Sequence, residues 1–491
     1  SGGNPLANGT VLGCAYDANN GLAWFSYNNT WVDGNGTDSS STVKGEIEAG
    51  TSGSQAFTTA NGAVGEAGLF IMATVRSVSS GNFSLRTRSD QWTGDCPSGF
   101  TALSTKNQAA AITYAIEDGS AYHQTTLYTG NGGSLSITQD GTTGQQTENI
   151  AKNSKFQPDF IWGKQRDGAQ EPTIFDVVRG TTKYIQTNST AGDATQSGVT
   201  AFNGDGFDLG SWAVMNENTK KHVAWQWLAG GAPTADNTAG AGSNLGSALA
   251  GTLPAKRLSA NTKAGFSIVK WTGNAGDGGA QTVAHGLGKK PNMIFIKNLD
   301  DSENWVVYHD DVGFNALPIN TSLRRITTGA SVYWNDTAHN DTIFNVNTHN
   351  GVNGANDEMI AYCFTAIPGY SAIGKYVGNG DSTNGPFVHT GFSPSWILAR
   401  AYDDTSDAAE GPVHDSMRDP INPMDLEISI NRNNAEDNSQ GAPQGDFLSN
   451  GFKIGYGVGT TGGGMNISGV NYIYLAFAKH PFAGTTPATA R

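Results

Sequence analysis

"KFQPDFIWGKQR", residues 155–166, is followed along the chain by two altered copies, "KKPNMIFIKNLD" from Lys289 and "GFSPSWILARAY" from Gly391. Each copy has a proline, a spacer, an apolar run and then Lys or Arg. In the first copy, Phe160 and Trp162 fall on one face of a strand and Ile161 falls on the other. The sequence therefore predicts that one strand is built three times, with Phe160 and Trp162 as packing residues.

The elements that flank this strand recur in a constant order. An aromatic strand ending in Gly-Asn precedes each copy, and an element ending in Asn follows it, at Asn188, Asn320 and Asn431. Each unit closes on an aromatic-rich strand, "HVAWQWLAG", "MIAYCFTA" or "YIYLAFAKHPF". In the last of these both alternating faces are apolar, which indicates a central strand packed on two sides. A unit of roughly 100 residues is longer than a solenoid repeat and can bury its own core, either as a separate bead or packed against the others.

These patterns predict an all-β, multidomain protein of antiparallel β-sandwich modules in tandem, jelly-roll or concanavalin-like in type. Residues 1–107 do not match the repeat, and "VLGCAYDANNGLAWFSYNNTW" within them predicts a β-hairpin around an Asn-Asn-Gly turn. The three repeats are expected at residues 108–231, 263–368 and 369–485. Residues 232–262 are rich in Gly, Ala and Thr and predict an extended or flexible linker.

Composition excludes some classes of function. The 491 residues hold 43 Asp and Glu against 29 Lys and Arg, and the formal net charge is −14. No basic stripe is present, so we expect no nucleic-acid partner, and no apolar run is long enough for membrane insertion. Three cysteines do not make a disulfide framework, and Cys363 in "IAYCFTA" is predicted to be a buried apolar residue.

Motifs for catalysis are absent from the sequence. It has no G-x-S-x-G, no H-E-x-x-H, no P-loop and no clustered Cys or His, so we predict no enzyme activity, no cofactor and no metal site. His309 and His414, each followed by Asp, are expected at equivalent positions of repeats 2 and 3 as structural polar groups. Asp and Arg at i, i+3 spacing, in the pairs Asp176–Arg179 and Asp415–Arg418, predict structural salt bridges.

Ligand-binding candidates lie in loops. Acidic residues follow the repeated strand in repeats 2 and 3, where they could hold a cation or a polar partner or be solvated loop tips: Asp300, Asp301, Glu303, Asp403, Asp404 and Asp407. Four tryptophans sit among Asn, Gly, Thr and Asp and are the candidates for stacking on a ligand: Trp31, Trp92, Trp212 and Trp334. Trp162, Trp225 and Trp227 lie in apolar strands, where core packing is expected.

Residues 11–31 resemble the central hairpin of a SPRY domain, here incomplete at its N-terminus because the chain starts almost at the hairpin. The three repeats resemble an uncharacterised repeat of tailed-bacteriophage virion proteins with the pattern F-x-P-D-x-V-W-I-K-x-R, F-D-x-x-R-G, F-x-x-D-G-F and Y-V-A-W. Repeat 1 carries that pattern at these positions: Phe156, Pro158, Trp162, Lys164, Arg166, Phe175, Asp176, Arg179, Gly180, Asn188, Asp205, Gly206, Phe207, Val223, Ala224 and Trp225. Repeats 2 and 3 depart from it, since Arg179 has no clear counterpart in repeat 2 and Gly180 becomes Asp419 or Pro420 in repeat 3.

The resemblance implies a non-enzymatic structural protein of a tailed-phage virion, made in the host cytoplasm, in a fibre or appendage that attaches to a host-surface glycan. Its expected partners are further copies of the chain, as a trimer, and other virion proteins. A capsid or tail decoration protein that binds other virion proteins is an alternative. A glycan depolymerase is another, and it requires two carboxylates about 5 to 10 Å apart in a cleft.

Overall fold

The computed structural model divides the chain into two compact units, residues 1–113 and 114–491. It describes residues 12–17, 22–27, 30–32, 54–55, 115–140, 145–147, 154–233, 237, 251–275, 279–327, 329, 331–381, 383–403, 410–437, 444–455 and 464–481. The first unit holds an antiparallel sheet of strands β1 (Leu12–Asp17), β2 (Leu22–Tyr27), β3 (Thr30–Val32) and β4 (Ser54–Gln55). Strands β1 and β2 pair from Leu12↔Tyr27 to Asp17↔Leu22, so the predicted hairpin is confirmed.

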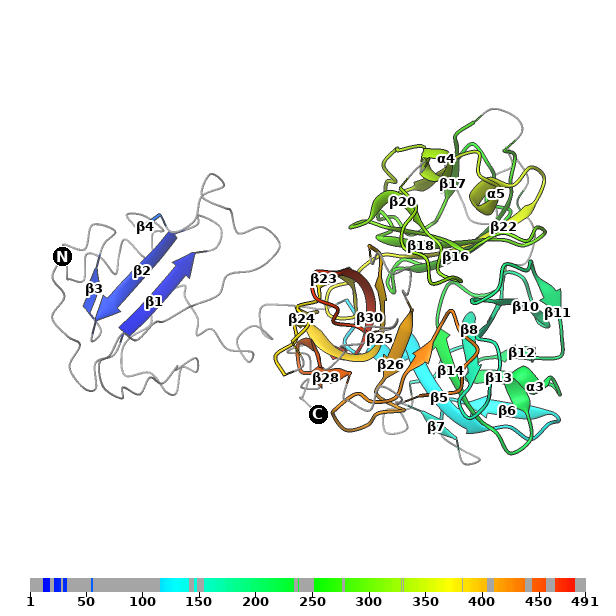
Figure 1. Ribbon diagram of the computed structural model, residues 1–491, viewed down its shortest axis with the longest axis horizontal. Helices are drawn as coiled ribbons and strands as arrows, with labels where there is room; N and C mark the ends of the chain where they lie inside the picture. The colour runs from blue at the N-terminus through cyan, green and yellow to red at the C-terminus, as the bar shows by residue number, and fades with distance from the viewer. Residues whose placement is uncertain are drawn as a thin grey trace. The chain divides into compact units, whose positions relative to one another are not determined.

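Each repeat of the second unit has one large and one small antiparallel sheet (Figure 1). In repeat 1 the large sheet has the order β11 (Ala194–Thr195), β10 (Lys183–Gln186), β9 (Thr173–Asp176), β8 (Phe160–Gln165), β14 (Lys221–Trp227), β5 (His123–Thr129) and β7 (Gln146–Thr147). Its small sheet has the order β12 (Val199–Asn203), β13 (Gly206–Leu209) and β6 (Leu135–Thr138).

Repeats 2 and 3 keep this plan with local changes at the sheet edges. The large sheet of repeat 2 has the order β15 (Arg257–Asn261), β16 (Phe266–Thr272), β22 (Glu358–Phe364), β18 (Met293–Asn298), β19 (Val306–His309) and β20 (Gly313–Leu317), and its small sheet is β17 (Gln281–Ala284) with β21 (Ile343–Val346). In repeat 3 the large sheet is β23 (Ser371–Val377), β30 (Asn471–Pro481), β25 (Phe392–Ala401), β26 (Pro412–Asp415) and β27 (Ile428–Ser429), and the small sheet is β24 (Phe387–His389), β29 (Gly451–Ile454) and β28 (Gly445–Leu448).

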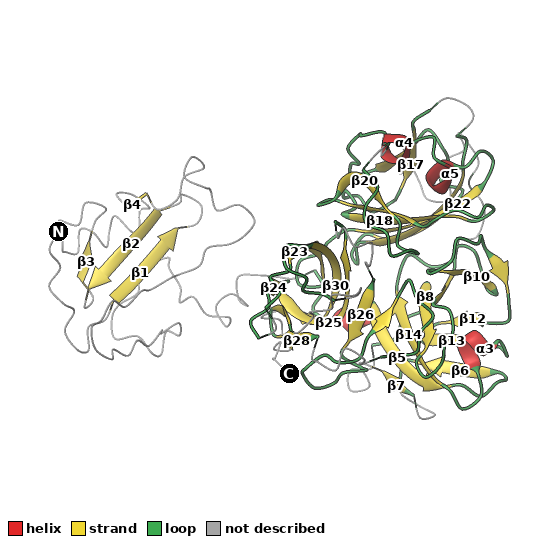
Figure 2. Ribbon diagram, in the orientation of Figure 1, coloured by secondary structure: helices red, strands yellow, loops and turns green. Residues whose placement is uncertain are grey.

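The helices in the described part of the second unit are single turns that precede or connect strands (Figure 2). They are η3 (Gly119–Ala121), α3 (Ala213–Asn216), α4 (Ser331–Trp334) and α5 (Asn350–Asn353). The predicted fold class, all-β with antiparallel sheets in several sandwich modules, is confirmed.

The strand that opens the sequence argument pairs with the closing strand in the same register in all three repeats. The facing pairs are Phe160↔Trp227, Met293↔Phe364 and Trp396↔Phe477. This register defines equivalent residues across the repeats, and the positions used below follow from it.

Both faces of these central strands are buried, as predicted. One face packs on the small sheet of its own repeat: Ile161, Ile294 and Ile397 belong to three separate cores. The other face of all three large sheets packs into a single shared core. Members of the shared core include Phe160, Trp162, Trp225, Trp227, Met293, Phe295, Tyr362, Phe364, Trp396, Leu398, Leu475 and Phe477.

The repeats therefore form three lobes of one compact body, each built on one of the large sheets of the second unit (Figure 1). Of the two arrangements that the sequence left open, beads packed together is the one observed. The edge-to-face contacts between Trp396 of repeat 3 and Trp225 and Trp227 of repeat 1, with centroids 6.1 and 5.4 Å apart, illustrate the packing. Such aromatic pairs stabilise a core beyond the area that they bury.

Part of the predicted linker is core. Residues 257–261 form strand β15, which pairs with β16 from Arg257↔Lys270 to Asn261↔Phe266. Leu253, Ala255 and Leu258 are buried in the core of repeat 2. The Gly- and Ala-rich composition predicts an unpacked connector, but these few apolar residues and a complete ladder of backbone hydrogen bonds suffice to dock its C-terminal third. Within residues 234–250 only Asn237 is described.

Cys363 is fully buried, as predicted, and burial raises the pKa of its thiol above the usual range. The side chain of Cys14 and the whole of Cys96 lie outside the described residues.

Candidate functional site

The interfaces between repeats contain the buried charges that the sequence motifs mark. Asp176 Oδ2 lies 2.6 Å from Arg179 Nε, and its Oδ1 accepts hydrogen bonds from the backbone N–H groups of Val178 and Arg179. Asp415 and Arg418 repeat this arrangement at 2.5 Å. Both predicted salt bridges are thus present and fully enclosed by protein. Burial opposes ionisation of Asp415, but the Arg418 guanidinium outweighs it and holds the pKa of that carboxyl below its usual value.

Each of these carboxylates also accepts a hydrogen bond from the closing strand of the next repeat. Trp225 Nε1 of repeat 1 donates to Asp415 Oδ2 of repeat 3 at 2.9 Å. Tyr362 Oη of repeat 2, at the position equivalent to Trp225, donates to Asp176 Oδ2 of repeat 1 at 2.8 Å. Leu475 takes this position in repeat 3 and has no polar group to donate. The buried carboxylates therefore fasten repeat 1 to repeat 3 and repeat 2 to repeat 1.

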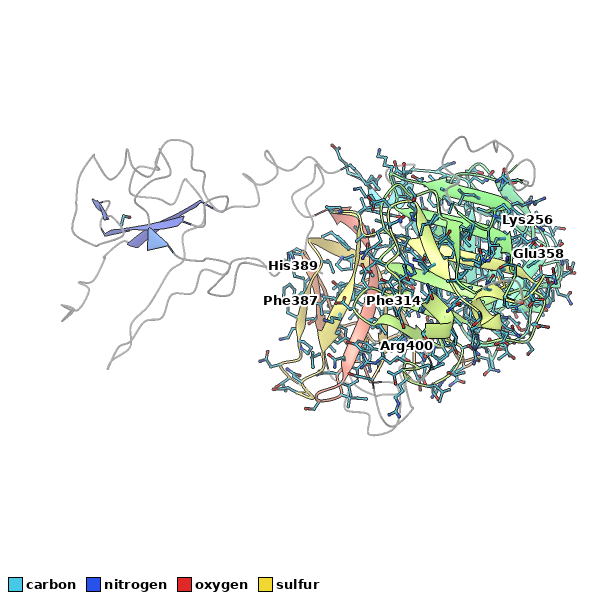
Figure 3. The ribbon with its side chains drawn as sticks, turned by 90° about the horizontal axis from the view of Figure 1, so that it is seen from above. Lys256, Phe314, Glu358, Phe387, His389 and Arg400 are labelled. Atoms are coloured by element: carbon cyan, nitrogen blue, oxygen red, sulfur yellow. The ribbon has the colours of Figure 1, made fainter. Side chains whose placement is uncertain are left out.

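The Lys or Arg that ends the repeated strand belongs to the same interfaces. Arg400 of repeat 3 donates from its Nη2 to the carbonyl oxygens of Pro318, Thr321 and Leu323 of repeat 2, at 2.8 to 3.0 Å, and Figure 3 marks its place. Lys164 of repeat 1 reaches the carbonyl of Asn433 in repeat 3 at 3.2 Å. Repeat 2 contacts repeat 1 through an indole, since Trp305 Nε1 donates to the carbonyl of Gln186 at 2.9 Å.

The contacts run from repeat 1 to 3, from 3 to 2 and from 2 to 1, so they close a ring. Burial lowers the pKa of Lys164 and of Lys297, its equivalent in repeat 2, to about 8, and that of Arg400 to about 10. Lys164 and Arg400 thus join two repeats, whereas Lys297 donates to the carbonyl of Asn298 in its own repeat at 2.6 Å.

The two histidines singled out in the sequence are not equivalent. Phe160, Met293 and Trp396 are equivalent residues of the repeated strand. The residues opposite them in the neighbouring strand are Asp176, His309 and Asp415, so His309 corresponds to the two aspartates. His414 is one residue out of register, and the predicted equivalence is wrong. Both rings are buried, and burial lowers the pKa of His309 to about 4 and that of His414 to about 3.

The acidic loops mainly secure the closing strands. Asp300 Oδ2 accepts from the backbone N–H of Glu358 at 2.7 Å, and Asp403 Oδ1 accepts from that of Asn471 at 2.8 Å. Asp167 does the same in repeat 1 for Lys221, at 3.1 Å. These carboxylates hold the first residue of β22, β30 and β14, which is a structural task. Next to Asp300 in the chain, Asp301 is exposed and Glu303 is half-buried, while Asp404 and Asp407 lie outside the described residues.

The four tryptophan candidates have different environments. Trp334 is fully buried against Tyr308 and His339, so the prediction that it offers a stacking surface is wrong. Trp212 is partly exposed and lies 4.4 Å, centroid to centroid, from Tyr184. The side chain of Trp31 and the whole of Trp92 lie outside the described residues.

One position, which we call the variable position, has a different side chain and different surroundings in each repeat. It directly precedes a residue of the shared core, which is Ile185 in repeat 1, Leu317 in repeat 2 and Ile428 in repeat 3. The residues at the variable position are therefore Tyr184, Ala316 and Glu427, in that order. In repeat 1 it forms part of the partly exposed pair with Trp212. In repeat 2 it is Ala316, which is buried, while Asn315, the residue before it, lines an open hollow of about 390 Å³ together with Phe314, Thr327, Gly329, Ser331 and Asp336.

In repeat 3 the variable position forms part of a carboxyl pair. The Ser429 hydroxyl lies 3.0 Å from Glu427 Oε1 and 3.1 Å from Glu410 Oε2, so it bridges the two carboxyl groups. Burial, together with the neighbouring charges of Glu410 and Asp437, raises the pKa of Glu427 to about 7, against the lowering effects of the Ser429 hydrogen bond and of Arg432. Burial also raises the pKa of Glu410, against the pull of Arg432. Near neutral pH this site can therefore hold one protonated carboxyl beside an ionised one, which is the arrangement that acid–base chemistry uses.

Sequence reasoning missed Tyr184, Glu410 and Glu427 because no motif marks them. The signal that could have found them is the disagreement of the three copies at the residue before a shared apolar position. Among the described residues, no group of three or more His, Cys, Asp or Glu could hold a metal ion. None of the described helices is long and apolar enough to cross a membrane.

Residues 118–481 match the model of a protein family, the domain of unknown function DUF7483. The chain belongs to this family. The family domain begins just before β5 and ends with β30, so it takes in the whole ring of three repeats as one domain. No curated protein and no solved structure matches the chain. The likeness to SPRY modules and to phage repeats is not addressed by these findings and stays a prediction.

Proposed function

We propose that this chain is a non-enzymatic structural protein of a tailed-phage virion, in a fibre or appendage, and that it attaches to glycans on the host surface. The observation that carries the proposal is the variable position. One scaffold is present three times, and the variable position belongs to a partly exposed aromatic pair in repeat 1, directly follows a residue that lines an open hollow in repeat 2, and belongs to a carboxyl pair in repeat 3.

The ring also suits an attachment role mechanically. Its three lobes share one core and are joined by buried charge-assisted hydrogen bonds, so surface groups on different repeats are held at fixed spacing. Weak contacts made by several such groups, and by several chains, add through effective concentration. We propose in addition that the copies assemble as trimers, as expected from the resemblance.

Two measurements test this proposal. An antibody against the purified chain is expected to label phage particles in electron micrographs, and absence of label from every particle would refute a virion location. Labelled protein is expected to bind host cells and to lose this binding once surface polysaccharide has been removed. Binding to particles that lack the protein, without binding to cells, would instead indicate a decoration protein.

A second candidate, a glycan depolymerase, is favoured by the Glu410–Glu427 pair. The two carboxyl groups cannot be further apart than the sum of their distances to the Ser429 hydroxyl, a spacing compatible with a retaining glycosidase. The assay is release of reducing ends from host polysaccharide by the wild-type chain and by Glu427→Gln. Release by wild type that disappears in the variant would support this candidate, and no release by wild type would end it.

A further inference from the structure

Trp212 and Tyr184 in repeat 1 form a fixed pair of rings at the protein surface. Both side chains are partly exposed, and their centroids are 4.4 Å apart with an interplanar angle of 44°. Behind them the buried ring of Phe175 lies 6.3 Å from each. A Cβ added to Gly198 would meet Phe175 at 2.2 Å and Trp212 at 3.0 Å, so the glycine is what allows this close packing. Phe175 thus supports the pair on its buried side, and the other side of the pair is accessible to solvent.

The polar atoms of this pair are not used by the fold. Within the part of the chain that the structure describes, no group forms a hydrogen bond with Trp212 Nε1 or with the hydroxyl of Tyr184, whereas the buried tyrosines Tyr128 and Tyr376 both donate to backbone carbonyls. Because Trp and Tyr combine a large apolar face with one polar tip, they suit ligands that are apolar on one face and polar at the edge.

Trp212 also occupies a position at which a side chain that caps the helix would be more stabilising. It is the N-cap of α3 and makes no side-chain hydrogen bond to the helix. His349 is the N-cap of α5, the corresponding turn of repeat 2, and its Nδ1 accepts from the backbone N–H of Gly351 at 2.9 Å. Loss of an N-cap typically destabilises a helix terminus. Repeat 1 therefore gives up a local stabilising contact that repeat 2 keeps, and the residue it has instead is a tryptophan facing solvent.

The scaffold does not require an aromatic residue at the partner position either. Tyr184 is replaced by Ala316 in repeat 2 and by Glu427 in repeat 3, with the same strand pairing. Both rings pack against the core of repeat 1, but the other repeats show that the scaffold folds without this pair. Local sequence rules that a protein breaks, such as the N-cap preference at Trp212, are broken most often at functional sites.

The chemistry around the rings is neutral and hydroxylic. The exposed hydroxyls of Ser197 and Ser211 lie 3.5 Å apart beside Trp212, whose backbone N–H donates to the Ser197 carbonyl. Hydroxyl groups, an indole N–H and a phenol can donate to and accept from sugar hydroxyls, while the ring faces can cover the C–H face of a pyranose. An acidic sugar would find no cationic partner among these groups.

We propose that Trp212 and Tyr184 are the glycan-stacking platform of repeat 1 and that they bind a neutral hexopyranose. This inference rests on the proposed attachment function and names the place and the sugar class that would serve it. A single-sugar site on an open surface is expected to be weak, with a dissociation constant on the order of millimolar.

The test titrates the full chain with methyl β-glucopyranoside, methyl β-galactopyranoside and the methyl glycoside of sialic acid, followed by ligand-observed NMR. Trp212→Ala and Trp212→His are the variants, the second because it gives repeat 1 the N-cap residue of repeat 2 and so protects the fold. Phe387→Ala is the matched control, since Phe387 is an aromatic residue of repeat 3 that is 47% exposed, beside His389 in Figure 3.

We expect wild type and Phe387→Ala to bind at least one neutral hexoside, and both Trp212 variants to lose roughly tenfold or more in affinity. Unchanged binding by Trp212→His, or wild-type binding of the sialic acid glycoside alone, would overturn the platform. If Trp212→His still binds host cells as wild type does, the attachment function is supported and the platform is refuted. If wild type binds a hexoside through Trp212 but binds no host cells, the platform is supported and the attachment function is refuted.

Discussion

Trp396→Ala is expected to destabilise repeats 1 and 3 together, because Trp396 belongs to repeat 3 but packs on repeat 1. The indole is fully buried, and its ring contacts include Trp225, Trp227 and, at 6.1 Å, His123. Truncating a buried Trp to Ala typically costs about 3 to 5 kcal/mol. We expect about 4 kcal/mol here, since tightly packed aromatic neighbours cannot collapse far into the gap. For a unit of this size that corresponds to a fall in Tm of roughly 5 °C.

The assay is calorimetry of the full chain combined with hydrogen exchange. In Trp396→Ala the amides of β14 and β8 in repeat 1 should exchange faster, although the mutation is in another repeat. Ile397→Ala is the control, because Ile397 is the next residue of the same strand and points into the core of repeat 3 alone. If exchange in repeat 1 is unaffected by Trp396→Ala, and only repeat 3 melts earlier, the shared core does not couple the repeats and the reasoning is refuted.

Three further outcomes are expected from the contacts described above. Tyr362→Phe should cost about 1.5 to 3 kcal/mol in urea unfolding, because it removes a hydrogen bond to Asp176, the partner of Arg179 in a buried salt bridge; a cost near zero would contradict the interface described. Glu427→Gln should flatten the pH dependence of stability: the raised pKa of this carboxyl makes wild-type stability fall as pH rises from about 4.5 to about 7, and thermal melts across this range would show no such difference if the carboxyl were solvated. Asp403→Ala should lower stability by about 1 kcal/mol, since it releases the backbone and side chain of Asn471, while leaving binding to host cells unchanged; weaker binding at unchanged stability would return this loop to the ligand candidates.

The repeats, their strands and the two-sided packing of the central strands could be predicted because the signals are local. Period-two alternation places Ile161 opposite Phe160, and three copies give the pattern three times. The closed ring could not be predicted in this way. Trp225, Tyr362 and Leu475 all look like ordinary core residues in sequence, and only their spatial partners distinguish the two that donate across an interface.

Two features differ from the sequence prediction for physical reasons. The Asn and Asp neighbours of Trp334 predict an accessible ring, but these residues serve the turn after α4, with positive φ at Asn335 and Asp336, while the indole points inward. Composition predicts a linker up to residue 262, but it does not register that Arg257–Asn261 gains its order from pairing with β16. The candidate site was harder still, since Tyr184 and Glu427 stand out only through comparison of structurally equivalent residues.

The ring has three interfaces within a single chain, and this determines how closure of the ring depends on protein concentration. A ring of three separate polypeptides falls apart on dilution, because its assembly is a third-order equilibrium in protomer concentration. Here the contact from Trp225 to Asp415 and the contact from Tyr362 to Asp176 form within one molecule. The fraction of molecules with a closed ring should therefore stay the same when the protein is diluted.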